Sequence, residues 1–460
     1  MVGQDVGALR KHIALIGFMG AGKTTIGREV ARLTQRPFVD TDEEVERRHG
    51  PIAEIFQERG ESEFRRIEEQ VVAEALSGPT AVIALGGGAV LSATTRDRLE
   101  RSAFAVWVPV DLETAWARVR RSDRPLAQDR DHFKRLYDER AEIYDVLAQG
   151  SGDDAEAVLV SALHIVFSSK VYYDAAVVVD ERVAALHELP VFRPPLSTHR
   201  VPSGEQAKTA AVVQRLWDEL RIGRDGWIVA FGGGSTTDVA GFVAATYLRG
   251  VRWLAVPTTL VGMVDAAIGG KTGVNIGTAK NLVGAFHFPW QVYVDARFLT
   301  TLPDEERRAG MAEVVKTGLL AGRDVWNLSE DKMIRACAAF KSAVVLSDPY
   351  ETKGRRQVLN LGHTFAHALE AGSGYTVRHG DAVALGLLAA LRLSGQATDV
   401  VEEVLAPKPV HADPDAAWAA LKRDKKGEGV FVLLEAPGQP TITTVPDEDA
   451  RRALEALIQK

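Results

Sequence analysis

Apolar runs alternate with amphipathic segments along the first third of the chain. His12–Ile16 is a short continuous apolar run, and Lys23–Leu33 has the periodicity of a helix. Further strands are expected near Val82–Leu85 and Phe104–Val110, and Ala155–Val166 is expected to close this region as a helix. Strands that alternate with helices predict a parallel sheet covered by helices.

A second α/β series follows the first. Strands are expected at Ala175–Val179, Trp227–Phe231 and Trp253–Val256, with a helix over Val239–Leu248, while Asp304–Leu393 is mostly helical by its periodicity. A chain of 460 residues is long enough for about three domains that each bury a core. We therefore predict domains at residues 1–168, 169–300 and 301–460: two α/β domains followed by an α-helical one.

Composition excludes several classes of protein. Apolar residues make up 46% and charged residues 25%, as in an ordinary globular chain, and the net charge is -7. No general basic field therefore attracts nucleic acid or an anionic membrane, and small anions need local basic sites. No apolar run reaches the ~18 residues that span a bilayer, and the first residues lack a signal-peptide pattern.

The chain has one cysteine, Cys337. It can form no intrachain disulfide and no Cys-rich zinc site, which fits a reducing cytoplasm. Its surroundings, Met333–Phe340, are typical of a buried helix, so we expect a core residue and not a catalytic thiol.

The segment Gly17–Thr24 matches G-x-x-x-x-G-K-[ST] and lies between the first expected strand and helix. Glycines let backbone N–H groups surround phosphates, Lys23 reaches the β- and γ-phosphates, and the Thr24 hydroxyl binds Mg²⁺. The motif predicts an ATP site of the P-loop type. The expected nucleotide contacts are Gly17, Gly20, Gly22, Lys23, Thr24 and Thr25.

Three later segments narrow the acceptor of the phosphate. Phe38–Asp42 places two carboxylates after an apolar stretch, Gly60–Arg65 adds an arginine, and Leu85–Val90 adds a glycine-rich strand end. Each alone is equally a solvated charge or a plain turn. Together, in this order, they resemble shikimate kinase over nearly all of residues 10–168.

The resemblance implies that Asp40 helps hold Mg²⁺ through water and that Asp42 binds substrate hydroxyls. It further implies that Arg65 and Arg140 bind the substrate carboxylate and that Gly87 lines the pocket. Arg124 is implied to be a lid arginine that acts in catalysis beside Lys23. The planar fork of arginine suits a carboxylate.

Glycine-rich segments also mark the second α/β series. Gly232–Asp238 follows an expected strand and precedes a helix, which leaves room for a pyrophosphate, but no G-x-G-x-x-G is present and a plain turn stays open. Pro257–Leu260, Gly269–Asn275 and Lys280–Phe286 place cationic and amide groups between glycines. That composition favours an anionic, polyhydroxylated ligand, although a loop with solvated lysines is the alternative.

His363 and His367 are four residues apart and would share one face of a helix. Spacing alone makes both of them zinc ligands, with a carboxylate to complete the site. One core and one surface histidine is the alternative.

Several motifs, taken together and in their order along the chain, resemble 3-dehydroquinate synthase over roughly residues 170–460. They are Ser203–Lys208, the Gly232 run, Tyr247–Gly250, Gly269–Lys271, Ala312–Lys316, the His363 segment and Asp424–Lys426. The family implies an NAD-binding α/β domain followed by an α-helical metal-binding domain. It also implies Zn²⁺ or Co²⁺ held by Glu313, His363 and His379, which moves His367 beside the substrate phosphate.

The same resemblance implies two further sets of contacts. Those to NAD⁺ are Asp180, Glu205, Lys208, Gly232, Gly233, Gly234, Asp238, Thr258 and Thr259. Those to the phosphorylated substrate are Asp265, Lys271, Asn281, Lys316, Lys341, Arg356, Asn360, His367 and Lys425, of which Lys271, Lys316 and His367 are expected to be catalytic. Arg249 is expected to reach the site from a neighbouring subunit, which implies a homodimer.

Two departures from the family pattern stand out. Thr237 replaces the usual glycine before Asp238, and Pro349–Tyr350 accompanies a one-residue insertion before Arg356. The resulting hypothesis is a bifunctional enzyme that makes shikimate 3-phosphate in its first part and 3-dehydroquinate in its second. The alternatives for the second part are another sugar-phosphate cyclase, a polyol dehydrogenase, or a binding module that has lost catalysis.

Overall fold

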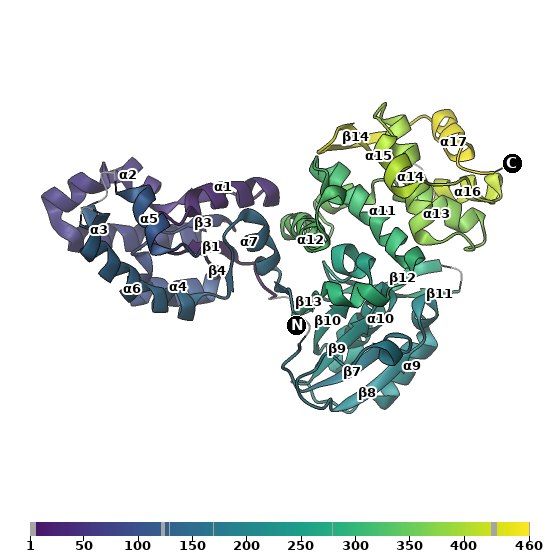
Figure 1. Ribbon diagram of the computed structural model, residues 1–460, viewed down its shortest axis with the longest axis horizontal. Coiled ribbons are helices and arrows are strands. Elements are labelled where there is room, and N and C mark those ends of the chain that lie inside the picture. Colours follow the sequence, from purple (N-terminus) through teal and green to yellow (C-terminus); the bar gives the residue numbers. More distant parts are fainter. Residues whose placement is uncertain are drawn as a thin grey trace. The chain divides into compact units, whose positions relative to one another are not determined.

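The computed structural model describes residues 6–120, 125–127, 129–168, 170–277, 279–424 and 430–459. These form two compact units (Figure 1). The first runs up to Ile165 and includes 342–347, and the second holds 166–341 and 348–459. The domain limits at 168 and 300 stay predictions.

The first unit is a parallel five-stranded sheet with helices on both sides (Figure 1). The strand order is β2-β3-β1-β4-β5. The strands are β1 (His12–Ile16), β2 (Phe38–Asp40), β3 (Val82–Ala84), β4 (Ala103–Trp107) and β5 (Gly150–Ser151). The helices are α1 (Lys23–Thr34), α2 (Thr41–His49), α3 (Ile52–Ser77), α4 (Ala93–Ser102), α5 (Leu112–Val119), α6 (Arg130–Leu147) and α7 (Ala155–Ala162), with 3₁₀ turns η1 (Ala89–Leu91) and η2 (Pro125–Ala127).

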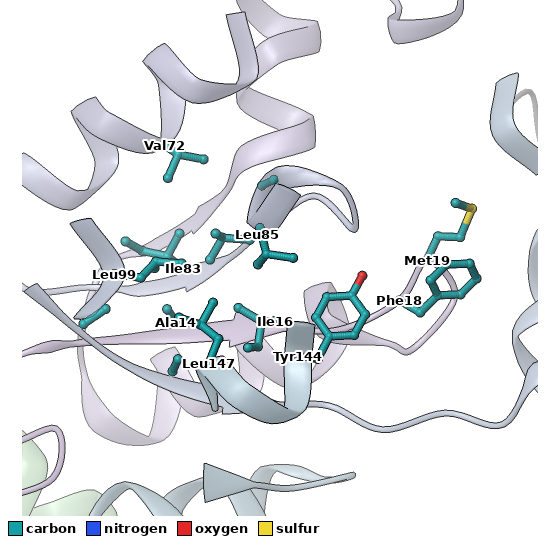
Figure 2. Packing of buried hydrophobic residues seen from close by; sticks show 14 of the residues in the cluster. Ala14, Ile16, Phe18, Met19, Val72, Ile83, Leu85, Leu99, Tyr144 and Leu147 are labelled. Atoms are coloured by element: carbon teal, nitrogen blue, oxygen red, sulfur yellow. The ribbon is translucent and has the colours of Figure 1, made fainter. Parts of the chain in front are cut away.

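Strand β1 is the middle strand of this sheet and pairs with β3 on one edge and β4 on the other. Ile13 lies opposite Val82 of β3 and opposite Phe104 of β4. All five residues of β1 are buried, which explains the continuous apolar run. Figure 2 shows the core extending along this strand to Phe18 and Met19, which follow it and are buried in the same cluster. The core therefore anchors the glycine-rich loop.

The helix expected over Ala155–Val166 is shorter than predicted. Helix α7 ends at Ala162, and His164 adopts a left-handed φ of 54°. Ile165–Val166 is instead strand β6, at the edge of the second sheet. The prediction was wrong at this end because a short apolar run fits a helix or a strand equally well.

The sheet of the second unit has the order β6-β13-β10-β9-β7-β8. Its pairs from β13 to β8 are parallel. The strands after β6 are β7 (Ala175–Asp180), β8 (Ser197–Val201), β9 (Trp227–Gly232), β10 (Arg252–Pro257) and β13 (Gln291–Tyr293). The accompanying helices and turns are α8 (Val183–Leu186), η3 (Gly204–Ala207), α9 (Ala210–Glu219), α10 (Gly234–Thr246), η4 (Tyr247–Arg249), the π-helical η5 (Gly262–Ala266) and η6 (Ala296–Thr301). A hairpin of β11 (Lys271–Ile276) and β12 (Ala279–Phe286) packs beside α10.

A helical part completes the second unit and lies apart from its sheet (Figure 1). It contains α11 (Asp304–Ala321), η7 (Val325–Asn327), α12 (Glu330–Ser347) as far as Lys341, η8 (Arg355–Asn360), α13 (His363–Gly372), α14 (His379–Leu393), α15 (Asp399–Leu405), α16 (Pro414–Asp424) and α17 (Asp447–Glu455). A hairpin of β14 (Val430–Ala436) and β15 (Gln439–Thr444) also belongs here and was not predicted. Together, the two units confirm the predicted fold class.

Cys337 is buried within α12, as its apolar surroundings predict. Among the described helices, none combines the length and the apolar character that crossing a bilayer requires.

Candidate active sites

The glycine-rich loop joins β1 to α1 in the first unit. Lys23 Nζ donates to the carbonyl oxygens of Gly17 and Phe18, at 2.8 and 2.9 Å. Gly22 begins α1 with a φ of 94°, and no side chain caps this helix end. Gly20 also has a positive φ, and Thr25 lies exposed in the first turn. The arrangement is one that binds phosphate: a lysine and the N–H groups of a helix start around one loop.

Thr24 and Asp40 meet across this loop. Thr24 Oγ1 donates to Asp40 Oδ2 at 2.6 Å. The other oxygen, Oδ1, accepts from the backbone N–H groups of Asp42 and Glu43 at the start of α2. A hydroxyl and a carboxylate held together offer the oxygen ligands that Mg²⁺ prefers.

A group of charges surrounds the glycine-rich end of β3. Arg65 Nη1 lies 2.6 Å from Glu68 Oε2, and the Glu68 side chain is only 3% exposed. A β-carbon at Gly88 would overlap the Arg65 guanidinium, and one at Gly86 would overlap an oxygen of Asp42. The two glycines thus leave room for these side chains to approach the end of β3 closely.

Glu68 is a residue that sequence reasoning missed. Burial raises the pKa of its carboxyl, even though the Arg65 guanidinium favours the charged form. The signal was present, because an acid three residues after Arg65 shares its helix face.

Arg140 is buried on α6 and is 2% exposed. Its Nε has no hydrogen-bond partner among the described residues, and its guanidinium lies 5.8 Å from the centre of the Phe18 ring. Burial lowers the pKa of Arg140. Nearby, Tyr144 Oη donates to the Gly87 carbonyl oxygen at 2.5 Å. A buried arginine with an unused donor suits an anionic ligand. Arg124 lies outside the described residues.

In the second unit a cavity of about 840 Å³ gathers many of the expected contact residues. It extends from the carboxyl ends of β7, β9 and β10 to the helices α11, α13 and α14. The expected residues that line it are Asp180, Glu205, Lys208, Gly233, Gly234, Asp238, Thr258, Thr259, Asp265, Asn281, Glu313, His367 and His379.

One side of the cavity is built at the start of α10. Lys208 Nζ lies 2.6 Å from Asp238 Oδ2 and also donates to the Asn281 side chain. Burial raises the pKa of Asp238, against the effect of Lys208. The Thr236 hydroxyl is buried without a hydrogen-bond partner among the described residues. An unused hydroxyl and free N–H groups at a helix start fit a pyrophosphate.

Two carboxylates that are held by hydrogen bonds lie beside the start of α10. Asp180 Oδ1 accepts from Ser203 Oγ at 2.7 Å, and Glu205 Oε2 accepts from Asn275 Nδ2 at 2.7 Å. Next to them Thr258 N donates to the carbonyl of Gly232 at 2.9 Å, which joins the ends of β9 and β10. Carboxylates at strand ends suit ribose hydroxyls.

Glu313, His363 and His379 bring three metal-ligand atoms within 4.8 Å of one another. Nε2 of His363 and Nε2 of His379 lie 3.5 and 3.6 Å from Glu313 Oε1. His367 is outside this group; its ring centre lies 5.8 Å from that of His363, and it lines the cavity. The structure therefore collects the set that the family resemblance implies and not the pair that spacing alone favours.

Two glycines let the helices that carry these ligands approach. A β-carbon at Gly380 would overlap the backbone of Ala309 on α11, and one at Gly386 would overlap the carbonyl of Gly362 before α13. Glycine at both places permits α14 to pack closely on its neighbours. The metal-ligand geometry is in this sense a result of backbone packing.

Charges around the group suit Glu313 and His363 as metal ligands, whereas His379 must lose a proton to bind. Burial lowers the pKa of His379, but Glu313 and Glu370 outweigh it and raise that pKa to about 9. Burial raises the pKa of Glu313, but Lys316 and His363 outweigh it and hold this pKa well below its usual value. Burial and the nearby Lys316 lower the pKa of His363 to about 4. The pKa of Glu370, a buried acid that sequence reasoning missed, is held at about 2, since His379 and Lys280 outweigh burial. An ionised carboxylate and a neutral imidazole are the forms that bind Zn²⁺.

Cationic side chains extend the site behind the metal ligands. Lys316 Nζ lies 2.5 Å from Glu313 Oε2, and Lys341 pairs with Asp265 and donates to its carbonyl at 2.8 Å. Lys271 lies farther out and pairs with Glu351 at 2.6 Å. Several of these groups are therefore held by carboxylates of the chain.

Arg356 is 2% exposed and donates to the carbonyls of Gly269 and Pro349 at 3.0 and 2.8 Å. Asp348 orders the segment with the inserted residue, because its carboxylate accepts from the backbone N–H groups of Thr352, Lys353 and Arg356. Asn360 and Arg249 are exposed and do not line the cavity, and Lys425 lies outside the described residues.

Comparisons with known proteins match one family to the first part of the chain and another family to the second part. The shikimate kinase family matches residues 19–165, and the N-terminal and C-terminal parts of 3-dehydroquinate synthase match 198–309 and 310–426. The 3-dehydroquinate synthase of Corynebacterium efficiens is 41% identical over 292 residues, covering 56% of this chain and 80% of the relative. That of Saccharopolyspora erythraea is 43% identical over 286 residues, covering 55% and 77%.

Solved structures with the fold of the second unit include two synthases of other products. A 2-deoxy-scyllo-inosose synthase complexed with carbaglucose-6-phosphate, NAD⁺ and Co²⁺ is 26% identical, with a TM-score of 0.55 over 64% of this chain and 96% of that one. A 2-epi-5-epi-valiolone synthase from Streptomyces hygroscopicus with NAD⁺ and Zn²⁺ is 25% identical, with a TM-score of 0.50 over 62% and 90%.

Proposed function

Because the chain belongs to the 3-dehydroquinate synthase family and carries a shikimate kinase domain ahead of it, we propose that both reactions occur on one polypeptide. The kinase transfers the γ-phosphate of ATP to shikimate and forms shikimate 3-phosphate. The synthase converts 3-deoxy-D-arabino-heptulosonate 7-phosphate to 3-dehydroquinate and phosphate. The observation that carries the synthase site is the group of Glu313, His363 and His379, of which Glu313 and His379 line the cavity.

In the kinase, Lys23 neutralises charge on the transferring phosphate, while Thr24 and Asp40 hold Mg²⁺. Arg65 and Arg140 grip the substrate carboxylate. The buried position of Arg140 favours this role, because a ligand carboxylate supplies the acceptor that its Nε lacks. Asp42 orients the hydroxyl that accepts phosphate, and Gly87 lines the pocket. Arg124 is assigned the catalytic role of the lid arginine from the family resemblance alone.

In the synthase, Glu313, His363 and His379 hold the metal, and the start of α10 with Asp180, Glu205 and Lys208 holds NAD⁺. When bound, the metal supplies Lewis acidity to a substrate hydroxyl and NAD⁺ accepts and returns hydride. The residues with substrate roles are Asp265, Lys271, Asn281, Lys316, Lys341, Arg356, Asn360, His367 and Lys425. Their mainly cationic character stabilises a phosphate and a carboxylate while charge moves.

A different sugar-phosphate cyclase is the alternative for the second unit, since two structural neighbours are named as synthases of other products. The identity of 41% to a 3-dehydroquinate synthase, against 25–26% to those neighbours, favours the dehydroquinate reaction. A polyol dehydrogenase is disfavoured by the same 41% identity to a 3-dehydroquinate synthase.

The active synthase is, in this proposal, a homodimer in the cytoplasm, with Arg249 entering the neighbouring site. Leu248 and Arg249 both have left-handed φ values, of 51° and 66°, and Leu248 is 43% exposed. Such backbone strain at an exposed apolar residue is more easily explained if a second subunit covers it.

One paired assay tests the function. The chain is given the heptulosonate phosphate with NAD⁺ and Zn²⁺, and phosphate release is followed; shikimate with ATP and Mg²⁺ is then supplied, and ADP is followed. Glu313→Ala is expected to abolish phosphate release and spare ADP formation, and Lys23→Ala to do the reverse. Wild-type protein that releases no phosphate would falsify the synthase assignment.

A further inference from the structure

The two histidines of the metal group are each held from the side that faces away from it. In both rings Nε2 is the nitrogen near Glu313, at 3.5 and 3.6 Å. Nδ1 of His363 lies 3.3 Å from the carbonyl oxygen of Leu361, and Nδ1 of His379 lies 3.4 Å from Glu370 Oε1. Each ring thus has an oxygen acceptor at Nδ1, one from the backbone and one from a carboxylate.

Glu370 belongs to α13, which begins at His363. Its side chain is 3% exposed, and the same Oε1 that faces His379 also accepts from Lys280 Nζ at 2.9 Å. Lys280 comes from the β12 strand and lies 5.2 Å from the centre of the Tyr375 ring. A buried carboxylate needs a partner, and Lys280 alone would meet that need. The approach of His379 to the same oxygen is the feature that a simple ion pair does not explain.

We infer that Glu370 is a positioning residue for the metal site. It accepts a hydrogen bond from Nδ1–H of His379, which leaves the lone pair of Nε2 directed at the ion. Lys280 fixes the carboxylate in place and so links the β11–β12 hairpin to the metal ligands. The inference rests on the proposed function, because it assumes a metal at Glu313, His363 and His379.

The link matters because the hairpin also reaches the other side of the cavity. Asn281, next to Lys280, accepts from Lys208 beside Asp238. One strand therefore contacts both the proposed NAD⁺ side and, through Glu370, a metal ligand.

The test measures Zn²⁺ affinity by competition with a chromophoric chelator, and the visible absorption of the Co²⁺-loaded protein, in the full-length chain. Three variants separate the roles of Glu370. Glu370→Gln keeps an acceptor at the same reach, and Glu370→Ala removes both the acceptor and the charge. Glu370→Asp keeps the charge but withdraws it from both partners, of which only Lys280, with its flexible side chain, can follow. The matched control is Glu402→Gln, which removes one acid from an exposed pair with Arg392.

Positioning by a hydrogen bond predicts that Glu370→Ala and Glu370→Asp bind Zn²⁺ about 10- to 100-fold more weakly, with shifted Co²⁺ bands. Glu370→Gln should stay closer to wild type, and Glu402→Gln should equal it. Wild-type affinity in the Asp variant would overturn the inference and leave a structural ion pair, as would a Gln variant no better than Ala. If Glu370→Ala fails to fold, the comparison of Asp with Gln still decides.

The outcome is separable from that of the proposed function. If the Zn²⁺ affinities of the variants follow the predicted order but no phosphate is released from the heptulosonate phosphate, the proposed function is wrong and the positioning role of Glu370 stands. Normal phosphate release with equal affinities would remove the positioning role alone.

Discussion

Thr24 Oγ1 donates a 2.6 Å hydrogen bond to Asp40 Oδ2, which joins the phosphate loop to the end of β2. The bond sets two oxygen ligands side by side where the phosphates of ATP are expected. Asp40 has a second task, since its other oxygen caps α2.

Asp40→Asn is expected to lower the rate of ADP formation by about tenfold or more, with partial recovery at high Mg²⁺, because asparagine is a weaker ligand for water-bound magnesium. The amide still caps the helix, so folding should be preserved. ADP formation is measured against Mg²⁺ concentration. Asp111→Asn, a change at the cap of α5, serves as control and should leave the Mg²⁺ dependence unaltered.

Arg140→Lys is expected to raise the KM for shikimate about 10- to 100-fold without changing the KM for ATP. A hydrogen bond to a charged group is worth ~1.5–3 kcal/mol, and lysine cannot reproduce the planar fork. Steady-state kinetics with each substrate varied measure the effect. Arg66→Lys, at an exposed arginine paired with Glu63, is the matched control. Equal changes in both KM values would contradict a carboxylate grip.

Lys208→Met is expected to destabilise the second unit by about 3 kcal/mol, the lower end for a broken buried pair, because it leaves the partly buried Asp238 without its cation. The double variant Lys208→Met/Asp238→Leu should recover part of that loss. Urea unfolding followed by circular dichroism checks both. A double variant as unstable as the sum of its single changes would show that the pair is not energetically coupled.

The pH dependence of the first unit is expected to reflect His12. Burial lowers the pKa of this histidine, and its Nδ1 accepts a 3.1 Å hydrogen bond from Ala81 N, so the folded unit holds it neutral. The unfolded chain binds a proton more readily, so this contribution to stability is present above about pH 6.5 and is lost as the pH falls toward the lowered folded pKa.

Hydrogen exchange of β1 and β3 at pH 7.5 and 5.5 measures this loss. His12→Asn places an amide oxygen near the position of Nδ1 and cannot titrate. Its exchange protection should therefore change less between the two pH values than that of the wild type. An equal change in both proteins would assign the acid sensitivity to other groups.

The dimer proposal predicts complementation between two inactive chains. Arg249→Ala and Glu313→Ala should each lose phosphate release, while a co-expressed mixture should recover about one quarter of the wild-type rate through sites with both residues intact. Phosphate release per total chain is the measurement. No recovery in a mixture that contains mixed dimers would place Arg249 outside the neighbouring site.

Much of the fold could be predicted because its signals are local. The β1 strand, the glycine loop and α1 follow one another within a short stretch, so periodicity and motif agree. The end of α7 was not predicted, since Ile165–Val166 becomes a strand only by pairing with β13, far along the chain. The β14–β15 hairpin was not predicted either.

In the candidate sites, too, local spacing predicted some features, while others depend on the packing of the fold. Spacing placed His363 and His367 on one helix face but could not say which histidine meets Glu313, because that depends on how α11, α13 and α14 pack together. Glu370 is seven residues after His363 and thus on its face, yet only the fold brings Lys280 and His379 to it. Burial of Glu68 and Arg140 likewise depends on packing that sequence spacing does not contain.

The close packing at Gly380 and Gly386 has a consequence for natural variation in this chain. Neither glycine offers an atom to a metal or a substrate, yet a methyl group at either position would push α14 away from Ala309 or Gly362. Genetic screens for loss of aromatic biosynthesis should therefore recover changes at these two positions as readily as changes at the ligands. Such variants should keep an active kinase. They would therefore complement a strain that lacks only the kinase step, which distinguishes them from truncations.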